Sequence, residues 1–278
     1  MPFGSYAFLY DDLLEDRRYE RLIADIESRL TTLDVRGEVS HLTLFQSAKT
    51  LAQNLVRQGA STIVLVGNDH TLDKVMWFAP DLPVTFAYIP VCAPSHVADL
   101  LGIPVGLGAC DVIAARYIEE LDVGRLDDRY FLTQVVVPQT TAAVSIEGAY
   151  QISAPESGSL VIQNLGSSNG ESSSQCIQRA KDGRLDVIMT PRDPNASRWR
   201  KSGLKPTTIP IHTGEIISTD PIDVQVDNHV VNGFRFKVSI APGKLKMITG
   251  RGRKVTLDPE RAQFGRRNDR AHLTYLAK

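Results

Sequence analysis

Short apolar runs alternate with amphipathic stretches over roughly the first 124 residues. Residues 6–10, 62–67 and 84–91 are continuous apolar runs, as is typical of strands buried on both faces of a parallel sheet. Apolar residues recur at helical spacing within residues 19–30, 51–56 and 72–76, and residues 96–120 also fit a helical pattern. Strand and helix in alternation predict a doubly wound α/β domain.

Beyond Arg125 the pattern changes to short strands separated by turn residues. Segments such as YFLTQVVVPQ, GSLVIQNLG, IDVQVD and FRFKVSIAP carry almost no helical periodicity, and this predicts an all-β domain, a β-sandwich. We therefore expect an α/β nucleotide-binding domain over 1–124 and a β-sandwich substrate domain over 125–254. A basic tail over 255–278 is expected to dock back on the N-terminal domain.

Charge is nearly balanced in total but not along the chain. The 278 residues carry 31 Lys and Arg against 32 Asp and Glu. Residues 1–128 hold 19 acids and 10 bases, whereas residues 129–278 hold 13 acids and 21 bases. The balanced total makes a protein that coats nucleic acid unlikely, but the asymmetry indicates a charged partner or a division of labour.

The cellular location is predicted from the absence of cysteine motifs, of a signal peptide and of a membrane-spanning segment in the sequence. The three cysteines form no CxxC pair, so neither a thiolate zinc site nor a disulfide framework is expected. There is no signal-peptide pattern and no apolar window of membrane-spanning length. We expect a cytoplasmic protein without a transmembrane segment, able to associate peripherally with the inner membrane surface; the sequence does not indicate an oligomeric state.

The segment GNDHTLDKV, residues 67–75, is the most informative one for chemistry. It follows a predicted buried strand and begins a helix. Ligands bind at such strand ends in α/β sheets, and the following helix offers free N–H groups to phosphate. Gly67 would let a phosphate approach the backbone. The alternative is that Asn68, Asp69 and Thr71 only cap the helix, and the local pattern leaves both readings open.

Several motifs occur in the order of a known family. GNDHTL is followed by LGIP at 101–104, by DVG at 122–124, by KDGRLDVIM at 181–189 and by VQVDNHV at 224–230. This series resembles the diacylglycerol kinase-like lipid kinases, which are distantly similar to NAD kinases. The resemblance implies ATP-dependent phosphorylation of a lipid hydroxyl at a membrane surface, with ATP and Mg²⁺ as cofactors.

The resemblance also implies roles for individual residues. The nucleotide would lie on the loop formed by Gly67, Asn68, Asp69, His70 and Thr71, in a crevice between the two domains. Asp227, in the last motif, would act as the catalytic base or position it. Phosphoryl transfer needs such positioning, together with neutralisation of charge and a group that takes the hydroxyl proton.

LGIP and DVG match the family pattern closely, but the chain departs from it at the motifs that carry the chemistry. GGDGT becomes Gly67 to Thr71 with two glycines replaced, GT-x-ND becomes residues 92–96 (CAPSH), and DGE becomes Asp227-Asn228-His229. Arg179 replaces an acidic residue of the family's structural-metal segment, and YDDLLED replaces the NPxSG-like loop. The alternative function is therefore a catalytically inactive pseudokinase that binds nucleotide, lipid or metal. A weaker alternative is a kinase of a soluble nucleotide such as NAD, although no NNDE-type acceptor segment is recognisable.

Three of the six histidines fall in the altered motifs: His70, His96 and His229. Imidazoles converging beside Asp69 and Asp227 could bind a transition metal. A shared metal site is therefore one hypothesis. The ordinary explanation, a loop or capping role for each histidine, remains beside it, because no HxH or HxxxH spacing is present.

Two basic segments are candidate contacts with a membrane. Trp199 is flanked by Arg192, Arg198, Arg200, Lys201 and Lys205, and a second cluster contains Lys244, Lys246, Arg251, Arg253 and Lys254. A tryptophan among cations suits the interface of an anionic membrane. Stacking on nucleic acid and a solvated surface are the alternatives, and the family resemblance favours lipid.

Overall fold

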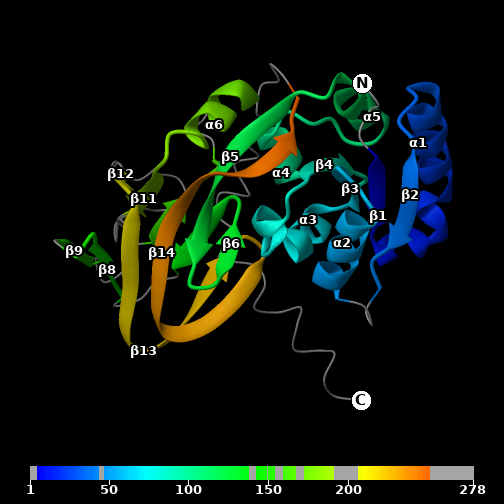
Figure 1. Ribbon diagram of the computed structural model, residues 1–278. Helices are drawn as coiled ribbons and strands as arrows, with labels where there is room; N and C mark the ends of the chain where they lie inside the picture. The colour runs from blue at the N-terminus through cyan, green and yellow to red at the C-terminus, as the bar shows by residue number, and fades with distance from the viewer. Residues whose placement is uncertain are drawn as a thin grey trace, which may run out of the picture.

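The N-terminal half of the computed structural model is a parallel sheet with helices around it (Figure 1). The structure describes residues 5–43, 47–137, 142–148, 150–153, 159–166, 172–190 and 206–250. The N-terminal elements are β1 (Tyr6–Tyr10), α1 (Glu20–Thr32), β2 (Gly37–His41), α2 (Ala48–Arg57), β3 (Thr62–Gly67), α3 (Asp69–Met76), β4 (Thr85–Pro90), α4 (His96–Leu100) and α5 (Leu107–Ala115). Short 3-10 turns occur at Asp12–Glu15, Arg17–Tyr19 and Ala79–Asp81.

The strand order of this sheet is β4-β3-β1-β2, with all neighbours parallel. Every residue of β1, β3 and β4 is buried, which confirms the expectation from the apolar runs. Helix α1 contacts α5 and α2 contacts α3, as expected when helices cover a parallel sheet. The predicted helix over 96–120 is wrong as one element, because Gly102, with φ +70°, ends α4 and residues from Ile118 onward form a strand.

The C-terminal half consists mainly of antiparallel strands. They are β5 (Ile118–Leu126), β6 (Arg129–Phe131), β7 (Gln134–Val137), β8 (Ala143–Ile146), β9 (Tyr150–Ser153), β10 (Ser159–Gln163), β11 (Leu185–Thr190), β12 (Thr207–Ile211), β13 (Thr213–Val226) and β14 (His229–Ile248). One helix, α6 (Ser173–Arg179), interrupts them. It was not predicted, because the serine-rich sequence around it gives no apolar periodicity.

Strands β13 and β14 are much longer than the sequence indicated. The pairing between them shifts register between Ile217 and Ile222, so the first part of β13 pairs with β8 and its last residues pair with β7. At its far end β14 pairs in parallel with β4, with Met247 opposite Phe86. One continuous strand therefore runs from the antiparallel half into the parallel sheet, as the orange ribbon in Figure 1 shows.

Two hydrophobic cores correspond to the two halves. One gathers around β1, β3 and β4 and includes Leu245, Met247 and Ile248 from the end of β14. The other lies among the antiparallel strands and contains Phe131, Val187 and Phe236. The predicted fold class, parallel α/β followed by all-β, is confirmed. The domain limits at 124 and 254 stay predictions, and the tail over 255–278 lies outside the described residues.

Within the described residues, no helix is both long and apolar enough to span a bilayer.

Candidate functional site

The strand order places a topological switch point at the carboxyl ends of β1 and β3. Chain connections from β1 lead to β2 on one side, while β3 and β4 lie on the other. Crevices at such points bind ligands in open α/β sheets. The two segments that meet here are the one after Tyr10 and the one after Val66, and they are joined by a hydrogen bond from the Asp11 N–H to the Val66 carbonyl (3.0 Å). The predicted nucleotide loop, Gly67 to Thr71, therefore lies where a ligand site is expected.

The space above Gly67 is filled by the chain itself. A Cβ atom built on Gly67 would lie 2.1 Å from Thr71 Oγ1, so the missing side chain is needed for the packing of Thr71. Asn68 and Thr71 form a reciprocal capping box: the Asn68 N–H donates to Thr71 Oγ1 (2.9 Å) and the Thr71 N–H donates to Asn68 Oδ1 (3.0 Å). The sequence left two roles open for this segment, phosphate binding and helix capping. In the structure the polar groups of Asn68 and Thr71 make the helix-capping contacts.

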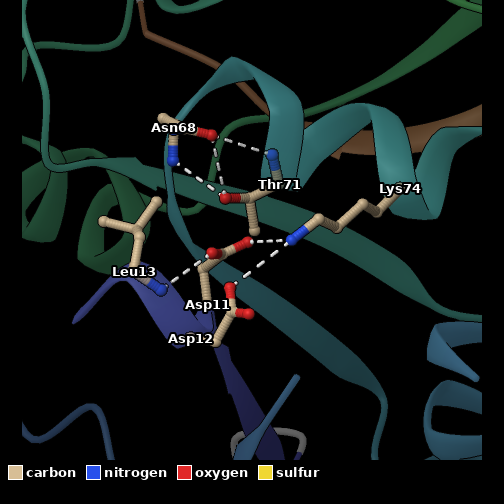
Figure 2. Close-up of polar contacts among 6 residues, drawn as sticks. All are labelled: Asp11, Asp12, Leu13, Asn68, Thr71 and Lys74. Atoms are coloured by element: carbon tan, nitrogen blue, oxygen red, sulfur yellow. Dashed lines mark hydrogen bonds and ion pairs between the residues drawn. The ribbon is translucent and has the colours of Figure 1, made fainter. Parts of the chain in front are cut away.

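An ion pair lies directly beside the capping box (Figure 2). Lys74, one turn further along α3, places Nζ 2.9 Å from Asp11 Oδ2 and 3.6 Å from Asp12 Oδ1. The Leu13 N–H donates to Asp11 Oδ1 (3.1 Å). Burial opposes ionisation of Asp11, but hydrogen bonds with Asp12 and Lys74 lower its pKa overall, while the bond to Asp11 raises the pKa of Asp12. The one cation of α3 is thus held by two carboxylates at the switch point.

Asp69, at the first turn of α3, ties this helix to α4. Its Oδ1 accepts hydrogen bonds from the hydroxyls of Tyr88 (3.1 Å) and Ser95, and its Oδ2 accepts one from the His96 N–H (2.9 Å). Ser95 Oγ also caps α4 by accepting from the Ala98 N–H. The carboxylate of the predicted nucleotide loop therefore accepts three hydrogen bonds from within the protein.

Asp227, the predicted base, lies in the turn between β13 and β14. Its φ of +49° and its backbone N–H bond to Gln134 O (2.9 Å) fix its position. The carboxylate accepts from the N–H groups of Leu132 (2.9 Å), Thr133 (2.9 Å) and Gln134 (3.0 Å), and from the Thr133 hydroxyl. Through these four hydrogen bonds Asp227 fixes the segment between β6 and β7. This structural role of Asp227 was not expected from the sequence.

A third carboxylate, Asp73, connects the two halves. It lies on α3, is 2 % exposed, and accepts a hydrogen bond from the side-chain amide of Asn228 in the β13–β14 turn. Burial, followed by the negative charges of Asp227 and Asp69, raises the pKa of Asp73 to about 8. Asp73 is therefore mainly uncharged at neutral pH. Buried carboxyl groups perturbed in this way mark candidate functional sites.

A cavity of about 280 Å³ opens beside the ion pair. We call it the Trp77 cavity; it is lined by Asp12, Leu42, Thr43, Ala48, Lys74, Trp77 and His229. The rings of Trp77 and His229 meet edge to face with centroids 4.4 Å apart, and the guanidinium of Arg129 lies 4.1 Å from the centroid of the indole. Burial lowers the pKa of His229 below its ordinary value. The cavity thus takes residues from both halves of the chain.

The three histidines of the metal hypothesis are placed separately. His229 lies against Trp77, while His70 and His96 are exposed at the starts of α3 and α4. His70 is near enough to His229 for its charge to lower the pKa of His229. Among the described residues there is no group of three or more His, Cys, Asp or Glu side chains arranged to hold a metal ion. Their geometry therefore gives the shared metal site no support.

Most of the predicted membrane segments cannot be located. Trp199 and its basic neighbours lie outside the described residues, as do Arg251, Arg253 and Lys254. Lys244 pairs with Asp81 at 3.7 Å and Lys246 pairs with Glu120 at 3.5 Å. The two described lysines of this cluster therefore each face a carboxylate rather than forming a free basic surface.

Sequence reasoning missed several residues that build the crevice. Asp11, Asp12, Asp73, Lys74 and Trp77 were not singled out. Two signals were present: the aspartates follow the first strand directly, and Lys74 lies three residues after Thr71 on the same helix, which is the spacing of neighbours on one helical face. The contacts with Arg129 and Asn228 depend on the long hairpin and have no local signal.

An α/β sheet with a crevice at its switch point, covered on one side by an antiparallel β half, defines a fold with an α/β lobe and a β lobe. The family model of the diacylglycerol kinase catalytic domain matches residues 8–126, which confirms over that segment the resemblance predicted from the sequence. No curated protein matches the sequence.

Solved structures agree with this assignment of the fold. The chain is similar to a diacylglycerol kinase from Bacillus anthracis strain Sterne, with 14 % identity, a TM-score of 0.70, and coverage of 90 % of this chain and 98 % of that one. A candidate diacylglycerol kinase from the same strain gives 13 % identity and a TM-score of 0.72, with the same coverage. At these identities the likeness describes the fold.

The family implies a nucleotide and a divalent metal, and the residues present can be tested for that role. Asp69 and Asp227 each accept three or more hydrogen bonds from the protein, and Thr71 fills the space above Gly67. Lys74, on the same helix, is neutralised by Asp11 and Asp12. A Mg²⁺–triphosphate needs free carboxylate oxygens, an open glycine backbone and available cations. The described crevice does not fit that group.

Proposed function

We propose that this protein is a diacylglycerol kinase-like binding module that does not transfer phosphate. One observation carries the proposal: the groups that would hold and activate a triphosphate are already engaged with each other. Asp69 binds the start of α4, Asp227 binds the segment after β6, and Lys74 binds Asp11 and Asp12. A catalytic group must be free to reach its substrate, and these contacts oppose that.

The cost in rate of losing several transition-state contacts also disfavours phosphate transfer. Removing one preorganised transition-state contact costs about 10² to 10³ in rate in characterised enzymes. Here two glycines of the loop are replaced. Asp69, Asp227 and Lys74 are each held by contacts within the protein. The fold, by contrast, keeps the crevice at the switch point and a cavity between the halves. Such a chain retains the means to bind a ligand.

The direct test is transfer of labelled phosphate from ATP to a lipid extract and to diacylglycerol vesicles, with and without Mg²⁺. We expect no product above that of a heat-inactivated sample. Thermal shift with the same lipids and with nucleotides then identifies ligands, because a ligand that binds only the folded state raises its melting temperature. Formation of a phosphorylated lipid would overturn the proposal.

ATP-dependent phosphorylation of a lipid hydroxyl is the second candidate, and Asp73 is the observation in its favour. A buried carboxyl with a pKa raised to about 8, near Asp69 and Asp227, is suited to exchange a proton near neutral pH. This candidate predicts measurable transfer that is lost in Asp73→Asn. It also predicts a rate that rises with pH as Asp73 ionises.

For either function, we propose an anionic membrane lipid as a partner through Trp199 and its basic neighbours. The test is sedimentation with vesicles containing anionic lipid, at low and at high salt. Neutralising Arg198, Arg200 and Lys201 together should weaken binding, because each base contributes about 1 kcal/mol near an anionic surface. The control is the loss of Lys246, which pairs with Glu120. Vesicle binding that is unchanged at high salt and in the triple variant would contradict the proposal of an anionic lipid partner.

A further inference from the structure

Helix α5 presents an apolar face to solvent. One side of it contacts α1 and β4. Its sequence, LGACDVIAA, contains one charged residue, Asp111, and that carboxylate pairs with Arg29 of α1. Leu107, which is 43 % exposed, and the exposed Ala114 lie seven residues apart and therefore share one face of the helix. A surface helix normally has a polar outer side, whereas a helix that is apolar all round is buried. We therefore expect the outer side of α5 to be covered in the intact protein.

The exposed apolar positions continue beyond both ends of this helix. Val105, just before α5, is 37 % exposed, and Ile118, just after it, is 42 % exposed. We call the whole set the α5 face; it consists of Val105, Leu107, Ala114, Ala115 and Ile118. Single exposed apolar residues are ordinary, but a group of them along one element marks an interaction site.

The described part of the chain ends beside the α5 face. Near the end of β14, Ile248 pairs with Ile118, which belongs to that face. The next residue, Thr249, donates its N–H to the Tyr117 carbonyl (2.9 Å). Residues 251–278, which lie outside the described residues, therefore start at one end of the α5 face.

Charge favours this terminal segment over a second copy of the chain as the occupant. Residues 251–278 hold eight Lys and Arg against three Asp and Glu, whereas residues 1–128 hold 19 acids and 10 bases. Two copies that met through α5 would bring two acidic halves together, and like charges oppose association. The terminal segment carries the opposite sign. It is also joined covalently to the same half, which gives it a high effective concentration there.

We propose that residues 272–276 (HLTYL) of the same chain pack on the α5 face and cover it. This stretch gathers three apolar side chains, Leu273, Tyr275 and Leu276, within a segment that is otherwise mainly polar. A flexible chain of n residues spans about 5–6 Å × √n, so residues 251–272 reach about 25 Å. Helix α5 is only about 14 Å long, and the whole face is within that reach. The inference is independent of the proposed function.

The experiment measures how fast a maleimide modifies a cysteine introduced into the α5 face of the full chain by Ala114→Cys. The rate is read at that position by mass spectrometry of peptides, so the native cysteines do not interfere. Replacing both leucines of the segment, by Leu273→Asp with Leu276→Asp, should raise the rate at least about tenfold, because protection of a covered site follows the population of the uncovered state. The same pair of substitutions should leave the rate unchanged for Val39→Cys, at an exposed apolar position of β2.

A charge-matched control separates apolar packing from charge. Gln263→Asp with Asn268→Asp adds the same two negative charges to the terminal segment but keeps both leucines, and it should leave the rate at position 114 nearly unchanged. Equal rates at position 114 with and without the two leucines would overturn the inference, as would release by the control pair. Protection that rises with protein concentration and persists without the leucines would show a second copy on the α5 face. Protection that requires anionic vesicles would show a membrane there, and either result would also overturn the inference.

Discussion

Helix α3 carries two neighbouring regions with opposite properties. At its N-terminus Asn68 and Thr71 satisfy each other, and Asp69 is bonded to the next helix. At its other end Trp77 Nε1 and His229 Nε2 have no hydrogen-bond partner among the described residues, and both rings line a cavity. The comparison teaches that replacing the glycines of a phosphate loop does not leave a vacant site. Asn68, in place of the second glycine, forms a capping box with Thr71, and the cavity of about 280 Å³ lies beside the other end of the helix.

The largest expected effect on this contrast comes from Asp227→Asn. An amide cannot accept all four hydrogen bonds that the buried carboxylate receives, and bonds to charged groups contribute about 1.5–3 kcal/mol each. We expect the free energy of unfolding to fall by about 3 kcal/mol in urea denaturation. Asp220→Asn, at an exposed residue of β13, is the control and should change stability by less than about 0.5 kcal/mol. Unchanged stability would mean that these hydrogen bonds do not stabilise the fold, and Asp227 would keep only its predicted catalytic role.

Next in size is the pH dependence created by Asp73. Its raised pKa means that the folded state holds a proton which the unfolded state releases above its ordinary value of 3.8. Stability therefore falls as pH rises from about 4 to about 8. Asp73→Asn removes this titration and keeps the shape of the neutral acid. The variant should gain on the wild type as pH rises through that window, by at most about 1.4 kcal/mol per pH unit. Melting curves with a constant gap at all pH values would contradict it.

A smaller loss is expected for Gly67→Ala. The new methyl group would lie 2.1 Å from Thr71 Oγ1, and overpacking of this kind costs about 1–3 kcal/mol. The matched variant Gly67→Ala with Thr71→Ala removes two of the three clashing atoms, Oγ1 and Cγ2, and leaves only the Cβ of residue 71 at 2.7 Å. Its loss of stability should be less than the sum of the two single losses, as in a double-mutant cycle between residues in contact. Additive losses would mean that Thr71 does not fill the space above Gly67.

The smallest effect is expected for Lys74→Gln. It leaves Asp11 buried with its hydrogen bonds to Asp12, Leu13 and Thr71. Lys74 is 41 % exposed, however, and solvent screens the pair. We expect a loss of about 1 kcal/mol that shrinks at high salt. Lys246→Gln, which breaks a pair exposed on both sides, serves as the control and should cost less than about 0.5 kcal/mol. Equal losses in the two variants would show that the ion pair at the switch point has no special role.

The parallel half of the fold could be predicted because burial on both faces leaves a local signature. The run at Thr62–Gly67 coincides with β3, and Thr85–Pro90 lies within one residue of the predicted strand at each end. Helix α6 and the break after α4 could not be predicted in the same way. The first is held by contacts with α4, and the second depends on the conformation of Gly102.

The sequence predicted where the candidate site lies in the fold, but not which residues contact one another there. Strand and helix order located the loop at Gly67 to Thr71, because ligand crevices follow topology. The hydrogen bonds from Thr133 and its neighbours to Asp227 join two segments that are separated by more than ninety residues. No local pattern encodes such a contact. The neutral state of Asp73 has the same origin, since it depends on burial by the opposite half of the chain.

Strand β14 bears on how this protein could be divided. Its last residues, Met247 and Ile248, belong to the core of the parallel half and pair with β4 and β5. A fragment that ended near residue 126 would keep the matched catalytic-domain segment. It would lose this strand, however, and leave β4 as an open edge with apolar side chains exposed. Unpaired edges of this kind promote aggregation. The segment that the family model matches is therefore not expected to fold stably alone, and a shortened version for biochemical work needs the chain through Gly250.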